Sequence, residues 1–172
     1  MRKRGRMAAA VIMAMVLLLT IGCDQGTKVL ARSYLGQGSV VSLLGGVLVM
    51  RYVENQGAFL SVGAWLPQPV RLIVLIAFPL CVLAAIAVYV LSRKGVRLVL
   101  AAGLAFIAGG GIGNLLDRIL RDGKVGDFLN LGIGRVRTGI FNVADLAIMF
   151  GCLLLLTDAV RTRGTKSEHG GV

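Results

Sequence analysis

Four long apolar segments limit what this chain can fold into. They run over about 7–23, 70–91, 98–116 and 140–157, and a helix of about 20 apolar residues crosses the hydrocarbon core of a bilayer. The composition agrees, because 56% of the 172 residues are hydrophobic and only 16% are charged, more apolar surface than a soluble domain of this size can bury. The pattern predicts one integral-membrane domain over 1–172, an all-α bundle of four transmembrane helices with a basic tail at 158–172.

Basic residues predict how the four segments are oriented. Clusters precede the first segment, separate the second from the third, and follow the fourth: Arg2, Lys3, Arg4 and Arg6; Arg93, Lys94 and Arg97; Arg161, Arg163 and Lys166. An even number of spans places all three on one side, which the positive-inside rule makes cytoplasmic. We therefore expect both termini in the cytoplasm and 24–69 and 117–139 outside. The net charge of +11 comes with long apolar runs and 6% aromatic residues, which does not favour nucleic-acid binding.

The first apolar segment admits a second interpretation, as a cleaved secretory signal. It has a basic start, an apolar centre and then Gly22-Cys23, whose end resembles a lipoprotein cleavage box. Thr20 stands where that box usually has Leu, and three further apolar segments follow. The sequence therefore favours a retained membrane helix.

The cysteines and the histidine predict no metal site and no cofactor. Cys23, Cys81 and Cys152 lie in or beside apolar runs without a repeated spacing, which favours apolar packing over disulfides. The one histidine, His169, lies in the polar tail, so neither a Ser-His dyad nor an H-E-x-x-H zinc site is expected.

Two further patterns predict local structure. The apolar stretches on either side of Gly45-Gly46 favour two short strands on the outer membrane face. In the third segment, Ala101, Ala105, Gly109 and Gly113 recur every four residues, and such a stripe lets another helix approach closely. The G-x-G-x-x-G nucleotide-binding pattern fails there, because Leu116 occupies the third glycine position.

Polar residues gather where the four segments meet the outer side. Ionisable groups at membrane depth are costly and are usually functional. Asp145 lies about five residues inside the fourth segment, roughly 7 Å below its outer end. The residues concerned are Asp24, Gln25 and Lys28; Glu54, Asn55 and Gly57; Asn114, Asp117 and Arg118; Asp127; and Asn142 and Asp145.

The carboxylates in this set have different neighbours in sequence. Asp24 and Lys28 are four residues apart, and Asp117 precedes Arg118, so both invite interpretation as structural ion pairs. Asp127 has no adjacent cation and is either solvated in a loop or paired with Asp145. Two close carboxylates share a proton. The ionised one then activates water and the protonated one donates to a scissile carbonyl, as in an aspartic-protease dyad.

Five boxes in this order resemble those of the lipoprotein signal peptidases, the type II signal peptidases of bacteria. The resemblance covers roughly residues 10–160. One departure is that Gly57-Ala58-Phe59 has one Ala where many members have two. The boxes are Asp24-Gln25-x-x-Lys28, Asn55-x-Gly57-Ala58, Gly113-Asn114-x-x-Asp117-Arg118, Val125-x-Asp127-Phe128 and Phe141-Asn142-x-Ala144-Asp145.

The resemblance implies an aspartic endopeptidase of the bacterial plasma membrane, with Asp127 and Asp145 catalytic near the extracytoplasmic face. Its substrate is a prolipoprotein carrying a diacylglyceryl group, cut just before the lipidated cysteine, and its inhibitors are cyclic peptides of the globomycin type. It also implies an outer β-cradle, a small amphipathic helix over the site, contact with membrane lipid, and a monomer. The residues that would shape the site or hold the substrate are Asp24, Lys28, Asn55, Gly57, Asn114, Arg118 and Asn142.

Two other functions stay open at this point. A Ser-Lys peptidase would need a serine near Lys28 or Lys124, and the candidates are Ser33, Ser39, Ser42 and Ser61. A small channel, transporter subunit or assembly factor would also have four helices, but the sequence has no inverted repeat and no central charged stripe.

Overall fold

Four helices and a small antiparallel sheet make up the computed structural model. It describes residues 2–36, 38–58, 63–93 and 95–168, with side chains from Met7 to Thr162. The chain order is α1 (Arg2–Leu35), β1 (Val41–Leu43), a 3₁₀ turn (Leu44–Gly46), β2 (Leu48–Asn55), α2 (Gln68–Ser92), α3 (Leu98–Leu120), β3 (Val125–Ile133), β4 (Val136–Arg137) and α4 (Val143–Glu168). Phe59, Ser61, Lys94 and His169 lie outside the described residues.

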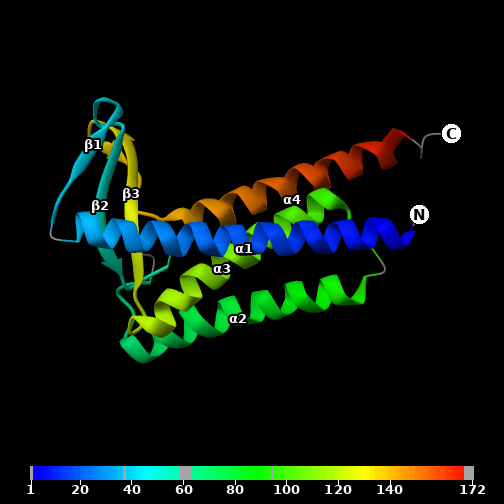
Figure 1. The fold of residues 1–172 in the computed structure, drawn as a ribbon, viewed down its shortest axis with the longest axis horizontal. Coiled ribbons are helices and arrows are strands. Elements are labelled where there is room, and N and C mark those ends of the chain that lie inside the picture. The colour runs from blue at the N-terminus through cyan, green and yellow to red at the C-terminus, as the bar shows by residue number, and fades with distance from the viewer. Residues whose placement is uncertain (1, 37, 59–62, 94, 169–172) are drawn as a thin grey trace.

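The helices form a multi-pass membrane bundle with the sheet at one end. All four are long and apolar enough to cross a bilayer, over Met7–Leu35, Gln68–Ser92, Leu98–Leu120 and Val143–Thr162. The sheet, ordered β1-β2-β3-β4, lies at the end opposite to where α1 begins and α4 ends (Figure 1). The four spans and the pair of strands around Gly45-Gly46 are confirmed. The all-α description was incomplete because β3 and β4 extend that pair to four strands.

Two helices are longer than the sequence predicted. The first continues beyond residue 23 to Leu35, because its charged groups pair within the helix: Lys28 Nζ lies 2.8 Å from Asp24 Oδ2. The fourth begins at Val143 and runs through the predicted tail to Glu168. The described residues between β2 and α2, 56–58 and 63–67, form bends and turns and no amphipathic helix.

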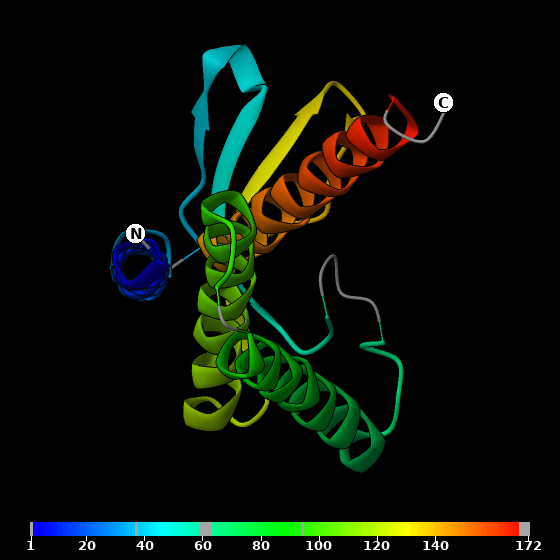
Figure 2. The same cartoon turned by 90° about the vertical axis from the view of Figure 1, so that its right-hand side faces the viewer.

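Small residues allow α3 to lie at the centre of the bundle (Figure 2). The predicted stripe is confirmed, since Ala101 and Ala105 are fully buried and Gly109 faces Thr20 of α1. A second stripe that the sequence did not predict faces α4, where Gly103 and Gly151 approach each other. By contrast, α2 packs on α3 without burying any of its residues.

The sheet is anchored on the C-terminal end of α1. Ala31 and Leu35 of the helix form a small apolar core with Phe128 of β3, and Met50 and Tyr52 of β2 pack against it. Residue 127, which precedes Phe128 in β3, pairs with Val53 of β2. The core therefore sets the position of the strand that carries Asp127.

The cysteines are not packing residues, so that prediction was wrong. Cys23, Cys81 and Cys152 are all exposed on the outside of the bundle. Inside a membrane an apolar thiol gains little from burial in protein, because lipid is an equally apolar neighbour.

Gly110 of α3 gives the first test of this packing. A Cβ added there would collide with the backbone carbonyl oxygen of Ala144, which precedes Asp145. We expect Gly110→Ala to destabilise the protein by about 1–3 kcal/mol through overpacking and to reduce activity. Thermal unfolding in detergent micelles measures this, with Gly22→Ala as the control because nothing lies within 4 Å of its added Cβ. Equal melting temperatures for the two variants would contradict the close α3–α4 approach.

Candidate active site

All predicted site residues meet in one buried cluster at the sheet end of the bundle. The structure brings together side chains from α1, β2, α3, β3 and the start of α4, and Gly57 of the β2–α2 segment is buried beside them. The buried polar side chains are Thr20, Asp24, Lys28, Asn55, Asn114, Asp117, Arg118, Asp127, Asn142 and Asp145. Such a concentration in a chain with 16% charged residues must be paired internally, because an unpaired buried polar group is costly.

Asp145 is held by the first turn of α4. Its backbone N–H donates to Asn142 Oδ1 at 3.0 Å, while the Asn142 backbone N–H donates to Asp145 Oδ2 at 3.1 Å. This reciprocal pair is a capping box. It explains why α4 begins at Val143, three residues later than predicted. The Asn-x-x-Asp spacing at 142–145 is the sequence signal for this helix start.

Asp127 lies in β3 and accepts two amide hydrogen bonds. Asn55 Nδ2 donates to its Oδ2 at 2.8 Å, and Asn142 Nδ2 donates to its Oδ1 at 2.6 Å. Asn142 therefore contacts both carboxyl groups. Burial raises the pKa of the Asp127 carboxyl to about 6, with the neighbouring Asp145 adding to the rise and the two amides opposing it. Asp127 is 2% exposed, so the alternative of a carboxylate solvated in a loop was wrong.

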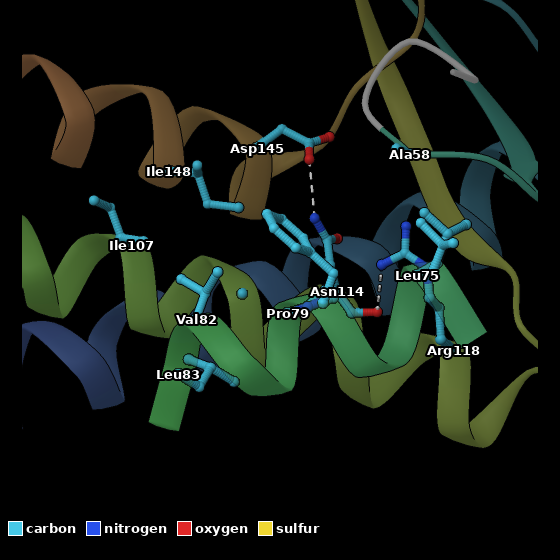
Figure 3. A pocket seen from close by; sticks show the side chains of 13 residues that line it. Ala58, Leu75, Pro79, Val82, Leu83, Ile107, Asn114, Arg118, Asp145 and Ile148 are labelled. Carbon is cyan, nitrogen blue, oxygen red and sulfur yellow. Dashed lines mark hydrogen bonds between the residues drawn. The ribbon is translucent and has the colours of Figure 1, made fainter. Parts of the chain in front are cut away.

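Asn114 of α3 links the carboxyl groups to a buried lysine. Its Nδ2 donates to Asp145 Oδ1 at 2.9 Å (Figure 3). Its Oδ1 accepts from Lys28 Nζ at 3.0 Å and from Asn142 Nδ2 at 3.1 Å. The Asn114 amide therefore connects Asp145 with Lys28 and Asn142.

The lysine stands between two aspartates. Lys28 Nζ lies 2.8 Å from Asp24 Oδ2 and 3.0 Å from Asp117 Oδ2, and all three side chains are nearly or completely buried. Asp24 Oδ1 also accepts from the Ala144 N–H at 2.9 Å. The predicted Asp24–Lys28 pair is confirmed. The predicted Asp117–Arg118 pair was wrong, since successive residues on a helix point in different directions.

Arg118 holds the segment that follows β2. Its Nη2 donates to the Gly57 carbonyl at 3.0 Å and its Nη1 to the Asn114 carbonyl at 3.3 Å. Its Nε is buried and has no hydrogen-bond partner among the described residues. Arg118 therefore shapes the entrance to the site rather than neutralising its neighbour in sequence.

A cavity of about 340 Å³ reaches this cluster from between α2, α3 and α4. Asp145, Asn114 and Arg118 line one end of it (Figure 3). The remainder is apolar and is lined by Val74, Leu75, Phe78, Pro79, Val82, Leu83, Ile107 and Ile148, with Ala58 near the polar end. An apolar chain can thus lie in the cavity with a polar group at the carboxylates.

The cluster does not favour a Ser-Lys peptidase. Among the described residues, the partners of Lys28 are Asp24, Asn114 and Asp117, and Lys124 pairs with Glu54 at 2.9 Å. Ser33, Ser39 and Ser42 are exposed. Within the part of the chain that the structure describes, no three His, Cys, Asp or Glu side chains are arranged to hold a metal ion.

Comparisons with known proteins agree on one family. The family model described as signal peptidase (SPase) II matches residues 16–161. The lipoprotein signal peptidase of Syntrophus aciditrophicus (strain SB) is 33% identical over 153 residues, 89% of this chain and 92% of the relative. That of Leifsonia xyli subsp. xyli (strain CTCB07) is 36% identical over 166 residues, 91% of this chain and 71% of the relative.

A solved structure has the same fold. It is described as a bacterial membrane enzyme determined by the in meso method at 2.3 Å resolution. The TM-score is 0.75 and the sequence identity 22%, over 92% of this chain and 91% of that chain. With the family model spanning most of the sequence and relatives more than 30% identical along it, this protein belongs to the signal peptidase II family of membrane peptidases.

Proposed function

We propose that this protein is an intramembrane aspartic endopeptidase that removes the signal peptide from diacylglyceryl-modified bacterial prolipoproteins. It cuts just before the lipidated cysteine. The observation that carries the proposal is that both carboxyl groups accept from one buried residue, Asn142, where an apolar cavity ends: Asp127 from its side-chain amide and Asp145 from its backbone N–H. The relatives named lipoprotein signal peptidases support the substrate class.

The chemistry needs one proton shared by the two carboxyl groups, since close like charges do not both ionise. The ionised carboxylate takes a proton from water as the water oxygen bonds to the scissile carbonyl carbon. The protonated carboxyl gives its proton to the carbonyl oxygen, which produces a gem-diol. When the C–N bond breaks, the carboxyl group that took a proton from water gives it to the amine nitrogen. The other carboxylate takes a proton from a hydroxyl group of the gem-diol, which becomes the carboxyl group of the released signal peptide.

The rest of the chain supports this chemistry as one domain over 1–172 that works as a monomer. The cavity between α2, α3 and α4 receives the apolar substrate from within the bilayer. The sheet forms a cradle on the extracytoplasmic face of the bacterial plasma membrane, and both termini are cytoplasmic. Asn55, Gly57 and Arg118 hold the substrate backbone, while Asp24, Lys28, Asn114 and Asn142 keep the carboxyl groups in place.

A cleavage assay tests the proposed function. Purified protein in micelles should shorten a diacylglyceryl-modified prolipoprotein on a gel, and a globomycin-type cyclic peptide should block the reaction. The matched control is the same precursor with its lipobox cysteine replaced by serine, which cannot carry the lipid. Equal cleavage of both precursors would contradict the lipidated substrate, and no cleavage of either would contradict the proposed function.

The dependence of activity on pH follows from the shared proton. Activity falls at low pH, where both carboxyl groups are protonated, and at high pH, where both are charged. Because the pKa of Asp127 is raised from 3.8 to about 6, this group keeps its proton to a higher pH than an ordinary Asp. We therefore expect a bell-shaped profile of kcat/KM whose alkaline side falls at about pH 6 or above. A chelator should leave the profile unchanged, and a single rise to an alkaline plateau would favour a Ser-Lys mechanism instead.

A further inference from the structure

The two carboxyl groups of the proposed dyad lie in unlike surroundings. Asp145 is in the first turn of α4, a helix of 26 residues, and its Oδ2 accepts the Asn142 backbone N–H. The amino end of a helix carries partial positive charge and favours an anion. Asp127 lies within β3, where a strand offers no comparable field.

The side-chain amides around the two carboxyl groups have fixed orientations, because each amide oxygen faces a partner that can only donate a hydrogen bond. The Lys28 ammonium can only donate, so it faces Asn114 Oδ1, and Nδ2 of Asn114 must face Asp145. The Asp145 N–H likewise fixes Asn142 Oδ1, so Nδ2 of Asn142 faces Asp127. The Gly57 N–H donates to Asn55 Oδ1, so Nδ2 of Asn55 also faces Asp127. Each carboxyl group thus meets two N–H donors, and the number of donors alone does not distinguish them.

Access to the cavity does distinguish them. Asp145 lines the cavity, whereas Asp127 is not among its lining residues and is only 2% exposed. A water molecule arriving through the cavity meets Asp145 first.

The surrounding charges come from three elements. Lys28 and Asp24 lie on α1, Asp117 and Arg118 lie on α3, and Asp127 itself faces α4 from β3. Lys28 is held between Asp24 and Asp117, which largely balances its charge. The Arg118 guanidinium lines the same end of the cavity as Asp145, whereas Asp127 does not line it. The α4 amino terminus and Arg118 are therefore the features that separate Asp145 from Asp127.

We propose that Asp145 is the ionised member of the pair and the general base, and that Asp127 is the protonated member and the general acid. This inference rests on the proposed function. Asp145 Oδ takes a proton from the attacking water, and Asp127 gives its proton to the scissile carbonyl oxygen. When the gem-diol collapses, Asp145 passes its proton to the leaving nitrogen, and Asp127 takes one from the diol, so each group returns to its starting state.

Chemical labelling tests the assignment on the full-length protein in micelles, without turnover. An ionised carboxylate opens an epoxide to a hydroxy ester, whereas a protonated carboxyl gives its proton to a diazo ester and takes the alkyl group as nitrogen gas leaves. We expect a small apolar epoxide to modify Asp145 at least about tenfold more than Asp127, because the ionised carboxylate is the nucleophile in this reaction. The diazo ester should show the opposite preference. Peptide mapping by mass spectrometry reads out both, with Glu54 as the reference for an exposed, ion-paired carboxylate outside the site.

The reverse pattern, or equal labelling of both groups, would overturn the assignment. It would leave the proposed function standing, because that is tested separately by whether Asn at either position stops cleavage. The matched variant is Asn142→Ser, which keeps an oxygen at the helix cap and the backbone donor to Asp145 but removes the amide donor to Asp127. The epoxide should still modify Asp145 in this variant. Transfer of the epoxide to Asp127 would also contradict the proposal.

Discussion

Asp127→Asn and Asp145→Asn should each reduce cleavage of a lipidated precursor by at least about a thousandfold, within the range that general acid-base groups contribute. Each change keeps the shape of the side chain but removes a group that holds or moves a proton. Single-turnover cleavage of purified variants measures the loss. Activity within about tenfold of the unmodified protein in either variant would contradict the dyad.

These losses must be separated from loss of the fold. Asn at 145 can still accept the Asn142 N–H through its amide oxygen, so the cap on α4 should persist. In each variant one carboxylate oxygen becomes an NH2 group that faces an amide donor, so one hydrogen bond is lost at each site. Both variants should still enter the membrane, and their melting temperatures should fall by no more than the loss of one hydrogen bond implies. A scaffold or channel would tolerate the same two changes, so the comparison also separates an enzyme from the alternative without catalysis.

Lys28→Met should cost about 3–5 kcal/mol of stability, because it leaves Asp24 and Asp117 buried without their cation. Lys28 is completely buried, and methionine fills a similar volume, so lost packing does not account for such an effect. Thermal unfolding in micelles measures it.

The matched control for this prediction is Lys124→Met. Lys124 also pairs with a carboxylate, Glu54 at 2.9 Å, but both side chains are more than a third exposed. Exposed ion pairs contribute little to stability, so the control should melt like the unmodified protein. Restoring charge balance with Asp24→Asn in the Lys28→Met background should recover part of the loss, and no recovery would contradict the ion-cluster explanation.

Much of this site was predictable because membrane depth makes polar residues conspicuous. Asp24, Asn114 and Asp145 stand out in apolar runs, and four spans that alternate in direction bring them to one end of the bundle. The strands around Gly45-Gly46 and the small-residue stripe of α3 were predictable from their periods. In each case a local pattern with one physical meaning was enough.

The partners within the site were not predictable, because they depend on three-dimensional packing. No pattern in the sequence around Asp117 indicated that its carboxylate pairs with Lys28 of another helix and not with the adjacent Arg118. The first helix was predicted too short because Asp24 resembles the end of an apolar run unless its partner, four residues on, is counted. The prediction that the cysteines are buried packing residues was wrong because it applies to water-soluble cores. There the burial of an apolar thiol has a driving force that lipid does not supply.

The exposure of α2 has a consequence for how substrates are told apart. This helix forms one wall of the cavity, yet it buries none of its residues against the rest of the protein. A signal peptide that leaves lipid to lie against it exchanges one hydrocarbon neighbour for another and gains little free energy from apolar contact. Discrimination between lipoprotein precursors and other membrane helices therefore has to come from the few hydrogen bonds at the polar end of the cavity, so the enzyme can accept signal sequences of very different composition.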